Sequence, residues 1–316
     1  MTAMPLKTRL LFVPAAFAAA ALALAGCSAS SPADASTSGG GGAKIDVVAS
    51  TDVYGDIAQT VGGDHVSVTS LIASFSQDPH DFEPSAADQL TMKNAKLVIA
   101  NGGGYDPFVG SLVSASGTTA PVINAVSLSP EWTGSDASEA VEGFNEHVFY
   151  EPDTMVAVAK EIAAQLGEID PGDADAFEAN AAAFEADVSG KIQPILDDIS
   201  KAHKGEKIFV TEPVPLYLAQ AAGLVNDTPS EFSEAVEEGD DVPPATLLEA
   251  LGLIGSGDVK IVFVNAQAAG AETTQVENKA AEVGVPVIKA SELLPDGDTY
   301  VSWMVDMATQ IKDALK

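Results

Sequence analysis

The sequence is poor in cysteine, in histidine and in positive charge. Its 316 residues include one Cys, four His, and 15 Lys and Arg against 46 Asp and Glu, so the formal net charge is −31. A chain this acidic repels phosphate backbones and anionic membrane surfaces, which argues against nucleic acids and lipid headgroups as ligands. A single cysteine allows neither an intramolecular disulfide framework nor a cysteine-rich zinc module. The acidity by itself favours a role in solubility over the binding of a cationic ligand.

Long apolar runs are also scarce, and the longest lies at the N-terminus. Residues 10–25 carry no charged or hydrogen-bonding side chain and follow Lys7 and Arg9. The run is short for a membrane-spanning helix and typical of a signal-peptide core. It ends at Leu-Ala-Gly-Cys (24–27), which resembles the bacterial lipobox, in which the cysteine is lipidated and becomes the new N-terminus. An ordinary secretory signal with an incidental cysteine is the alternative.

The next segment is expected to be a tether. Residues 28–42 consist mostly of Ser, Gly, Ala and Thr, which cannot bury a core. We therefore predict a lipoprotein signal peptide over 1–26 and a lipid-anchored Cys27 with a flexible linker over 27–43. This organisation implies a protein held at the outer face of the cytoplasmic membrane.

From residue 44 onward, strand-like and helix-like segments alternate, which predicts an α/β protein with mostly parallel sheets covered by helices. The expected strands are 45–50, 66–72, 97–100, 122–126, 207–211, 259–265 and 285–289. The expected helices are 53–61, 85–93 with Ser85 as N-cap, 153–166 with Asp153 as N-cap, 173–203, 216–222, 244–256, 274–283 and 300–315.

One of these helices is long enough to join two lobes. Apolar residues recur at three- and four-residue steps over 173–203, and Pro194 is expected to kink the helix. We predict an N-terminal lobe over 44–171, a connector helix over 172–204 and a C-terminal lobe over 205–316.

Four side chains that could bind a metal lie at the ends of predicted elements. His80 and His147 each precede a helix, whereas Glu212 and Glu292 each follow a strand. Ligands of open α/β sheets bind beyond the carboxyl ends of strands. Two neutral imidazoles and two carboxylates would balance one divalent cation. Taken singly, each residue could equally be a solvated loop residue or a helix cap.

The other two histidines are not expected to bind metal. His65 lies in an apparent exposed turn, and His203 lies among lysines at a helix C-terminus, where a positive charge favours the helix dipole.

Several longer motifs resemble one family. They are Gly-Gly-Asp-His-Val (62–66), Asp-Pro-His-Asp-Phe-Glu-Pro-Ser (78–85), Asn-Gly (101–102), His147 followed by Pro152, Asn-Ala-Gln (265–267) and Gly-Val-Pro-Val (284–287). Together they resemble the cluster A-I solute-binding proteins, the metal-binding lipoproteins of bacterial manganese/zinc ABC transporters. The resemblance covers about residues 44–316 and implies two α/β lobes, one long helix between them and one buried metal site.

The resemblance also implies a ligand set. His80 and His147 match the first two family ligands, and Glu212 matches a third position where the family has His or Glu. The fourth ligand is usually Asp; here Glu292 matches it, with Asp296 and Asp298 as alternatives. The acidic loop 131–146 contains no histidine, so the His-rich loop of some zinc members is absent.

The function implied is capture of one divalent metal ion by a monomer and its delivery to an ABC-transporter permease, without catalysis. Oxygen-rich ligation favours Mn²⁺, with Zn²⁺ a close second and Fe²⁺ a minor possibility. One alternative is a metal-dependent surface adhesin. The other is a metallo-hydrolase with Glu146 or Glu151 as base, although no motif such as His-Glu-x-x-His supports it.

Overall fold

The computed structural model describes residues 43–316 except 75, 76, 78, 81 and 269. The predicted signal peptide, Cys27 and nearly all of the linker lie outside the described residues. The described residues belong to one compact unit. No helix within the described part of the chain is long and apolar enough to cross a membrane.

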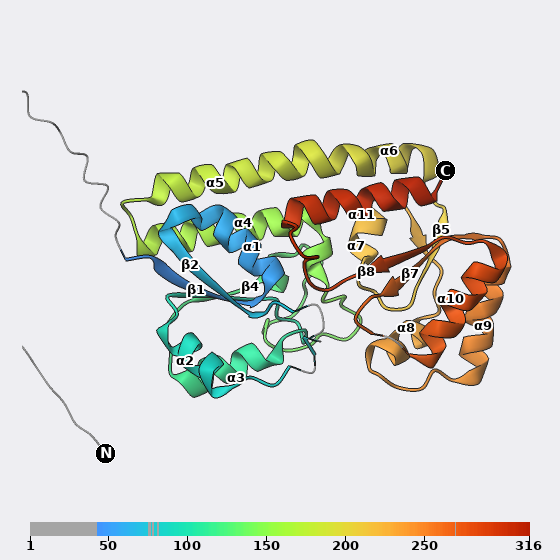
Figure 1. Cartoon of the computed structure of the whole chain (residues 1–316), viewed down its shortest axis with the longest axis horizontal. Helices are drawn as coiled ribbons and strands as arrows, with labels where there is room; N and C mark the ends of the chain where they lie inside the picture. The colour runs from blue at the N-terminus through green and yellow to red at the C-terminus, as the bar shows by residue number, and fades with distance from the viewer. Residues whose placement is uncertain (1–42, 75–76, 78, 81, 269) are drawn as a thin grey trace, which may run out of the picture. The chain divides into compact units, whose positions relative to one another are not determined.

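Two four-stranded parallel sheets form the framework, as the alternating pattern predicted (Figure 1). The first has the order β2-β1-β3-β4 and comprises β1 (Ile45–Thr51), β2 (Val66–Ile72), β3 (Leu97–Ala100) and β4 (Val122–Asn124). The second has the order β6-β5-β7-β8 and comprises β5 (Lys207–Val210), β6 (Val225–Asn226), β7 (Val259–Asn265) and β8 (Val287–Ala290). The two sheets thus repeat one topology, and the prediction of two α/β lobes is confirmed.

Both faces of each sheet are covered, which explains why the central strands β3, β5 and β7 are mostly apolar, whereas the edge strand β2 alternates with polar residues. In β1, Val47 and Ala49 pack into one apolar cluster and Val48 into another, on the opposite face of the sheet. The N-terminal lobe carries α1 (Asp52–Gly62), α2 (Ala86–Asn94), α3 (Pro107–Ser116) and α4 (Pro152–Ile169). In Figure 1, α2 and α3 lie on one side of the first sheet and α1 and α4 on the other.

The C-terminal lobe is built in the same way. Its helices are α7 (Leu216–Ala221), α8 (Ser230–Glu237), α9 (Pro244–Gly255), α10 (Ala271–Val283) and α11 (Tyr300–Ala314). Helices α9 and α10 pack on each other and on β7, whereas α11 packs on β7, β8 and α6 (Gln193–His203).

The predicted long helix is present but contains a π-helical turn. It comprises α5 (Ala174–Asp187), the π turn Val188–Ile192 and α6 (Gln193–His203). Pro194 has no N–H to donate to the carbonyl four residues earlier, and the N–H of Gln193 donates to the carbonyl of Val188. The proline therefore coincides with a local widening of the helix, and α5 and α6 still run in line (Figure 1).

Several local predictions differ from the structure. Helices α3 and α8 and the short strand β6 were not predicted, because they lie beside Gly-rich or acidic stretches that read as loops. Helix α4 begins at Pro152 with Glu151 at the N-cap, so Asp153 lies in the first turn rather than capping it. The Ser85 prediction is confirmed: its hydroxyl accepts from the N–H of Asp88, in a full capping box.

The lobes are joined by contacts to the backbone of residues 291–300. The hydroxyl of Tyr150 donates to the carbonyl of Ser291 at 2.9 Å. The Asp52 and Asp56 carboxylates on α1 accept from the N–H groups of Leu294 at 3.1 Å and Tyr300 at 2.8 Å. The segment around Glu292 is therefore tied to the N-terminal lobe as well as to its own sheet.

We expect Asp52→Asn to stabilise the protein at high pH only. Burial raises the pKa of Asp52 from 3.8 to about 6, more than the hydrogen bond from Leu294 lowers it. A carboxyl with a raised folded-state pKa contributes stability below its unfolded pKa and loses it as the pH rises through about 6. Asparagine keeps the acceptor without the charge, so the free energy of unfolding should rise by about 1 kcal/mol at pH 8. Urea unfolding at pH 4 and pH 8 measures this, with the exposed Asp46→Asn as control; equal gains at both pH values would contradict it.

Candidate metal centre

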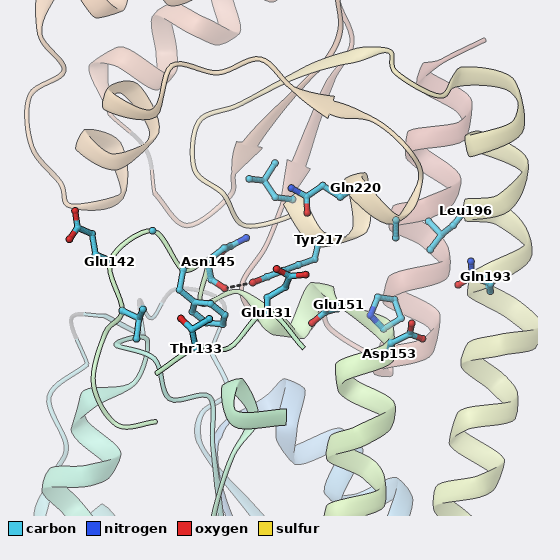
Figure 2. Close-up of a pocket in the computed structure, with 16 residues that line it drawn as sticks. Glu131, Thr133, Glu142, Asn145, Glu151, Asp153, Gln193, Leu196, Tyr217 and Gln220 are labelled. Carbon is cyan, nitrogen blue, oxygen red and sulfur yellow. Dashed lines mark hydrogen bonds between the residues drawn. The ribbon is translucent and has the colours of Figure 1, made fainter. Parts of the chain in front are cut away.

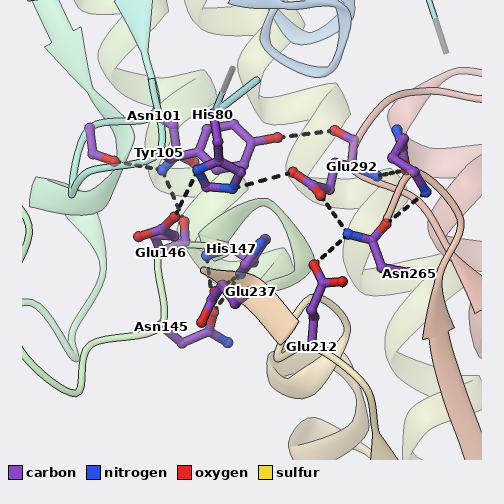
Figure 3. A network of polar contacts seen from close by, with 12 residues as sticks. His80, Asn101, Tyr105, Asn145, Glu146, His147, Glu212, Glu237, Asn265 and Glu292 are labelled. Atoms are coloured by element: carbon purple, nitrogen blue, oxygen red, sulfur yellow. Dashed lines mark hydrogen bonds and ion pairs between the residues drawn. The ribbon is translucent and has the colours of Figure 1, made fainter. Parts of the chain in front are cut away.

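Loops from both lobes meet where the strands end. His80 lies between β2 and α2, His147 precedes α4, and Glu292 follows β8. The structure places candidate ligand atoms of these three residues within 4.8 Å of one another. His80 Nε2 lies 3.8 Å from Glu292 Oε2 (Figure 3). His147 and Glu292 are buried, with exposed fractions of 0% and 1%, whereas the His80 side chain remains 31% exposed.

Glu212 adjoins this cluster through an amide. It follows β5, is 5% exposed, and accepts from Asn265 Nδ2 at 2.6 Å through Oε2. The same nitrogen donates to Glu292 Oε1 at 2.7 Å, so one asparagine at the end of β7 connects the two carboxylates (Figure 3). The alternatives Asp296 and Asp298 instead line a separate cavity beside α1. Neither belongs to the cluster of His80, His147 and Glu292.

Asn145 determines which nitrogen of His147 carries the proton. Its Oδ1 lies 2.8 Å from His147 Nδ1 and accepts from the His147 backbone N–H at 3.1 Å. Because a carbonyl oxygen only accepts, Nδ1 carries the proton and Nε2 carries the lone pair. Nε2 is buried and has no hydrogen-bond partner among the described residues. It is therefore available to a ligand.

His80 has a comparable neighbour. Glu146 Oε1 lies 3.6 Å from His80 Nδ1, on the ring edge opposite the nitrogen that faces Glu292. The ring of Tyr105 packs against His80 with centroids 5.2 Å apart, and its hydroxyl donates to the backbone carbonyl of Glu292 at 3.4 Å. Asn101, after β3, donates to the carbonyl of Glu146 at 2.9 Å. These contacts point His80 Nε2 toward Glu292.

Acidic side chains surround the buried ring of His147. Burial raises the pKa of Glu146 to about 8, assisted by repulsion from Glu237 and Glu292. Burial, followed by repulsion from Glu292, raises the pKa of Glu237 to about 7. Burial, followed by the proximity of His80, lowers the pKa of His147 to about 3. His147 is therefore neutral at physiological pH, and a bound cation would stabilise the charged forms of Glu146 and Glu237.

Sequence reasoning missed Asn145 and Glu237 as neighbours of the site. It named Glu146 only as a candidate base for hydrolysis and Asn265 only within a family motif, not as neighbours of the metal ligands. Asn145 and Glu146 directly precede His147, so their position in the chain was a signal that could have found them. Glu237 ends the unpredicted helix α8 and reaches within 3.9 Å of His147 Nδ1.

A separate cavity adjoins the candidate metal centre, and Asn145 forms part of its wall. It has a volume of about 680 Å³, and its walls come from residues 131–153, from α6 and from α7. Figure 2 shows Asn145 and Tyr217 in its wall, where the Tyr217 hydroxyl donates to the Asn145 carbonyl at 2.7 Å. Glu151, one of the two candidate bases for hydrolysis, also lines this cavity and accepts from Ser129 and Thr154.

Comparisons with known proteins agree with this architecture. A sequence profile of the family described as "Zinc-uptake complex component A periplasmic" matches residues 47–314. The manganese-binding lipoprotein MntA of Halalkalibacterium halodurans is 25% identical over 270 residues, covering 82% of this chain and 85% of that protein. The iron ABC transporter substrate-binding lipoprotein MtsA of Streptococcus pyogenes serotype M1 is 24% identical over 286 residues, covering 86% and 89%.

Solved structures share the fold. The Mn-bound periplasmic metal-binding protein from Candidatus Liberibacter asiaticus superposes with a TM-score of 0.69 at 22% sequence identity. The match covers 86% of this chain and 100% of that one.

Proposed function

Since this chain belongs to the family of the periplasmic zinc-uptake complex component A, we propose that it captures one divalent transition-metal ion as its cargo. The family is one of uptake components, not of enzymes. The observation that carries the proposal is the convergence of His80, His147 and Glu292 around the buried His147 Nε2. Glu146 and Glu237 lie within 4 Å of the Nδ1 atoms of His80 and His147, respectively.

The residues fit such an ion. Nitrogen and oxygen ligands bound to one metal at about 2.0–2.2 Å lie roughly 3–4.4 Å apart. The three candidate ligand atoms already lie within 4.8 Å of one another, so a contraction of a few tenths of an ångström brings them to this range. If the hydrogen bond from Asn265 Nδ2 broke, Glu212 Oε2 would be able to serve as the fourth ligand. We propose His80, His147, Glu212 and Glu292 as the ligand set.

Manganese is the proposed cargo. Two carboxylates give an oxygen-rich site that suits Mn²⁺ better than an all-imidazole site would, although Zn²⁺ binds such ligands more tightly at equal concentration. The relatives are named for manganese and iron and the family for zinc, so they favour a divalent transition metal without selecting one.

Delivery to an ABC-transporter permease is the proposed next step. The relative MtsA is named as an ABC transporter substrate-binding lipoprotein. We propose that this chain is likewise anchored through Cys27 outside the cytoplasm, acts as a monomer and docks on a permease. The proposed lobes are 44–171 and 205–316, with 172–204 as the connector.

Removal of Glu212 tests the function. Metal-stripped protein dialysed against Mn²⁺ and Zn²⁺, separately and together, should bind one equivalent in total. Glu212→Ala should bind at least about 100-fold more weakly, because it removes a charged ligand. Glu249→Ala, an exposed glutamate on α9, is the matched control and should bind as wild type does. Absence of tight binding by the wild type would overturn the metal-capture function, and an unaffected Glu212→Ala would remove Glu212 from the ligand set.

A further inference from the structure

Asn145 contacts both lobes within one side chain. Its Nδ2 donates to the carbonyl of Pro213 at 3.0 Å, and this carbonyl belongs to the C-terminal lobe. A backbone carbonyl only accepts, so this bond sets the direction of the amide and leaves Oδ1 facing His147. There Oδ1 accepts from the backbone N–H at 3.1 Å and from ring Nδ1 at 2.8 Å. The orientation of the amide is therefore fixed by three contacts.

The attachment to the C-terminal lobe lies directly beside Glu212. Pro213 follows Glu212 in the chain, and its carbonyl also accepts from the N–H of Leu216 at 3.1 Å. Tyr217, on α7, donates through its hydroxyl to the backbone carbonyl of Asn145 at 2.7 Å (Figure 2). Two hydrogen bonds thus join residue 145 to residues 213–217.

The Glu292 loop is attached to the N-terminal lobe by other residues. Tyr150 exchanges hydrogen bonds with the backbone of Ser291, donating at 2.9 Å and accepting at 3.2 Å, and Tyr105 contacts the carbonyl of Glu292. The loops of the two glutamates are therefore held by different residues of the N-terminal lobe. The residue that holds the Glu212 loop is also the residue that orients His147.

We infer that Asn145 is a positioning residue that couples the orientation and tautomer of His147 to the attachment of the Glu212 loop. This inference rests on the proposed metal capture. When the loop is in place, Pro213 holds the amide and the lone pair of His147 Nε2 faces the site. When the loop moves away, the amide loses Pro213 and is free to turn, which removes the acceptor that keeps the proton on Nδ1. Loss of one ligand loop thereby loosens a second ligand on the other lobe.

Two substitutions separate the parts of this coupling. Asn145→Ala removes both the acceptor for His147 and the donor to Pro213. Asn145→Asp keeps the acceptor and replaces the donor by an oxygen that faces the Pro213 carbonyl. The matched control is Asn180→Ala, which removes a similar amide hydrogen bond, to the carbonyl of Val61 at 2.9 Å, away from the site.

The primary readout is the His147 tautomer in the metal-free full chain, measured by ¹⁵N NMR of the imidazole. We expect Nδ1–H in wild type, Asn145→Asp and Asn180→Ala, and a substantial Nε2–H fraction in Asn145→Ala. Exchange of the backbone amide hydrogens of Val214, Leu216 and Tyr217 should accelerate in both Asn145 variants and not in Asn180→Ala. Metal affinity should fall about 10–100-fold in Asn145→Ala and be partly rescued by aspartate.

Two results would overturn the inference: an unchanged His147 tautomer in Asn145→Ala, or an equal loss of affinity in Asn180→Ala. The tautomer and exchange measurements need no metal. They therefore decide the role of Asn145 even if the wild type binds neither Mn²⁺ nor Zn²⁺, the result that would refute the proposed function.

Discussion

Glu292→Gln is expected to stabilise the metal-free protein and to abolish tight metal binding. Glu292 is 1% exposed and repels Glu146 and Glu237, whose pKa values it helps to raise. Glutamine keeps an acceptor for Asn265 Nδ2 and removes the charge. The free energy of unfolding without metal should rise by about 1–2 kcal/mol, because a buried, repelled charge is lost.

The same substitution removes a proposed charged ligand from the cluster with His80 and His147. Metal affinity should fall by about three orders of magnitude, and the rise in melting temperature that saturating metal gives the wild type should disappear. Thermal unfolding with and without Mn²⁺ measures both effects, and Glu249→Gln should change neither. If Glu292→Gln kept wild-type affinity, Glu292 would not be a ligand.

Trp303→Ala is expected to cost about 3–5 kcal/mol of unfolding free energy, the usual range for removing a large buried aromatic. Trp303 is 3% exposed and lies on α11, which also contacts α1 of the N-terminal lobe. Its ring packs edge-on against Tyr150 with centroids 5.0 Å apart and contacts Phe149 and Tyr300. Truncation would leave a cavity directly behind the tyrosine that holds Ser291.

Trp132→Ala is the matched control. Trp132 is only half-buried and packs against Phe144, with centroids 4.9 Å apart. Its removal should lower the free energy of unfolding by about 1–2 kcal/mol, since the half-buried Trp132 ring buries less apolar surface than the ring of Trp303. Urea unfolding of both variants gives the comparison. Equal costs would show that the contacts of Trp303 between the lobes contribute little to stability.

The alternation of strand-like and helix-like segments was sufficient to predict the fold class, because parallel strands need helical crossovers that cover the faces of the sheet. The sequence analysis missed helices in segments whose local composition is typical of loops. Helix α8 (Ser230–Glu237) is acidic, and it forms where Phe232 is buried against Phe209 of β5. Its apolar residues Phe232, Ala235 and Val236 follow helical spacing, but a segment of eight residues is too short for that pattern to predict a helix by itself.

The candidate site could be predicted in part. The four proposed ligands were each predicted from a place beside a strand or helix, and the family resemblance supported the same set. They are His80, His147, Glu212 and Glu292. Their neighbours were not accessible in this way. Asn265 and Glu237 come from β7 and α8, and no sequence spacing relates them to Glu292 or His147.

The sequence alone determined the acidity of the chain, the alternation of strands and helices, and the residues that could bind a metal, since these depend on composition and local order. The tertiary structure decided which of those residues meet. It brought Glu292 rather than Asp296 or Asp298 beside His80, and it gave the His147 proton to Nδ1 through Asn145. The reason is physical: burial and hydrogen-bond direction are set by groups that are distant in the chain and become neighbours only when the strand ends of both sheets converge.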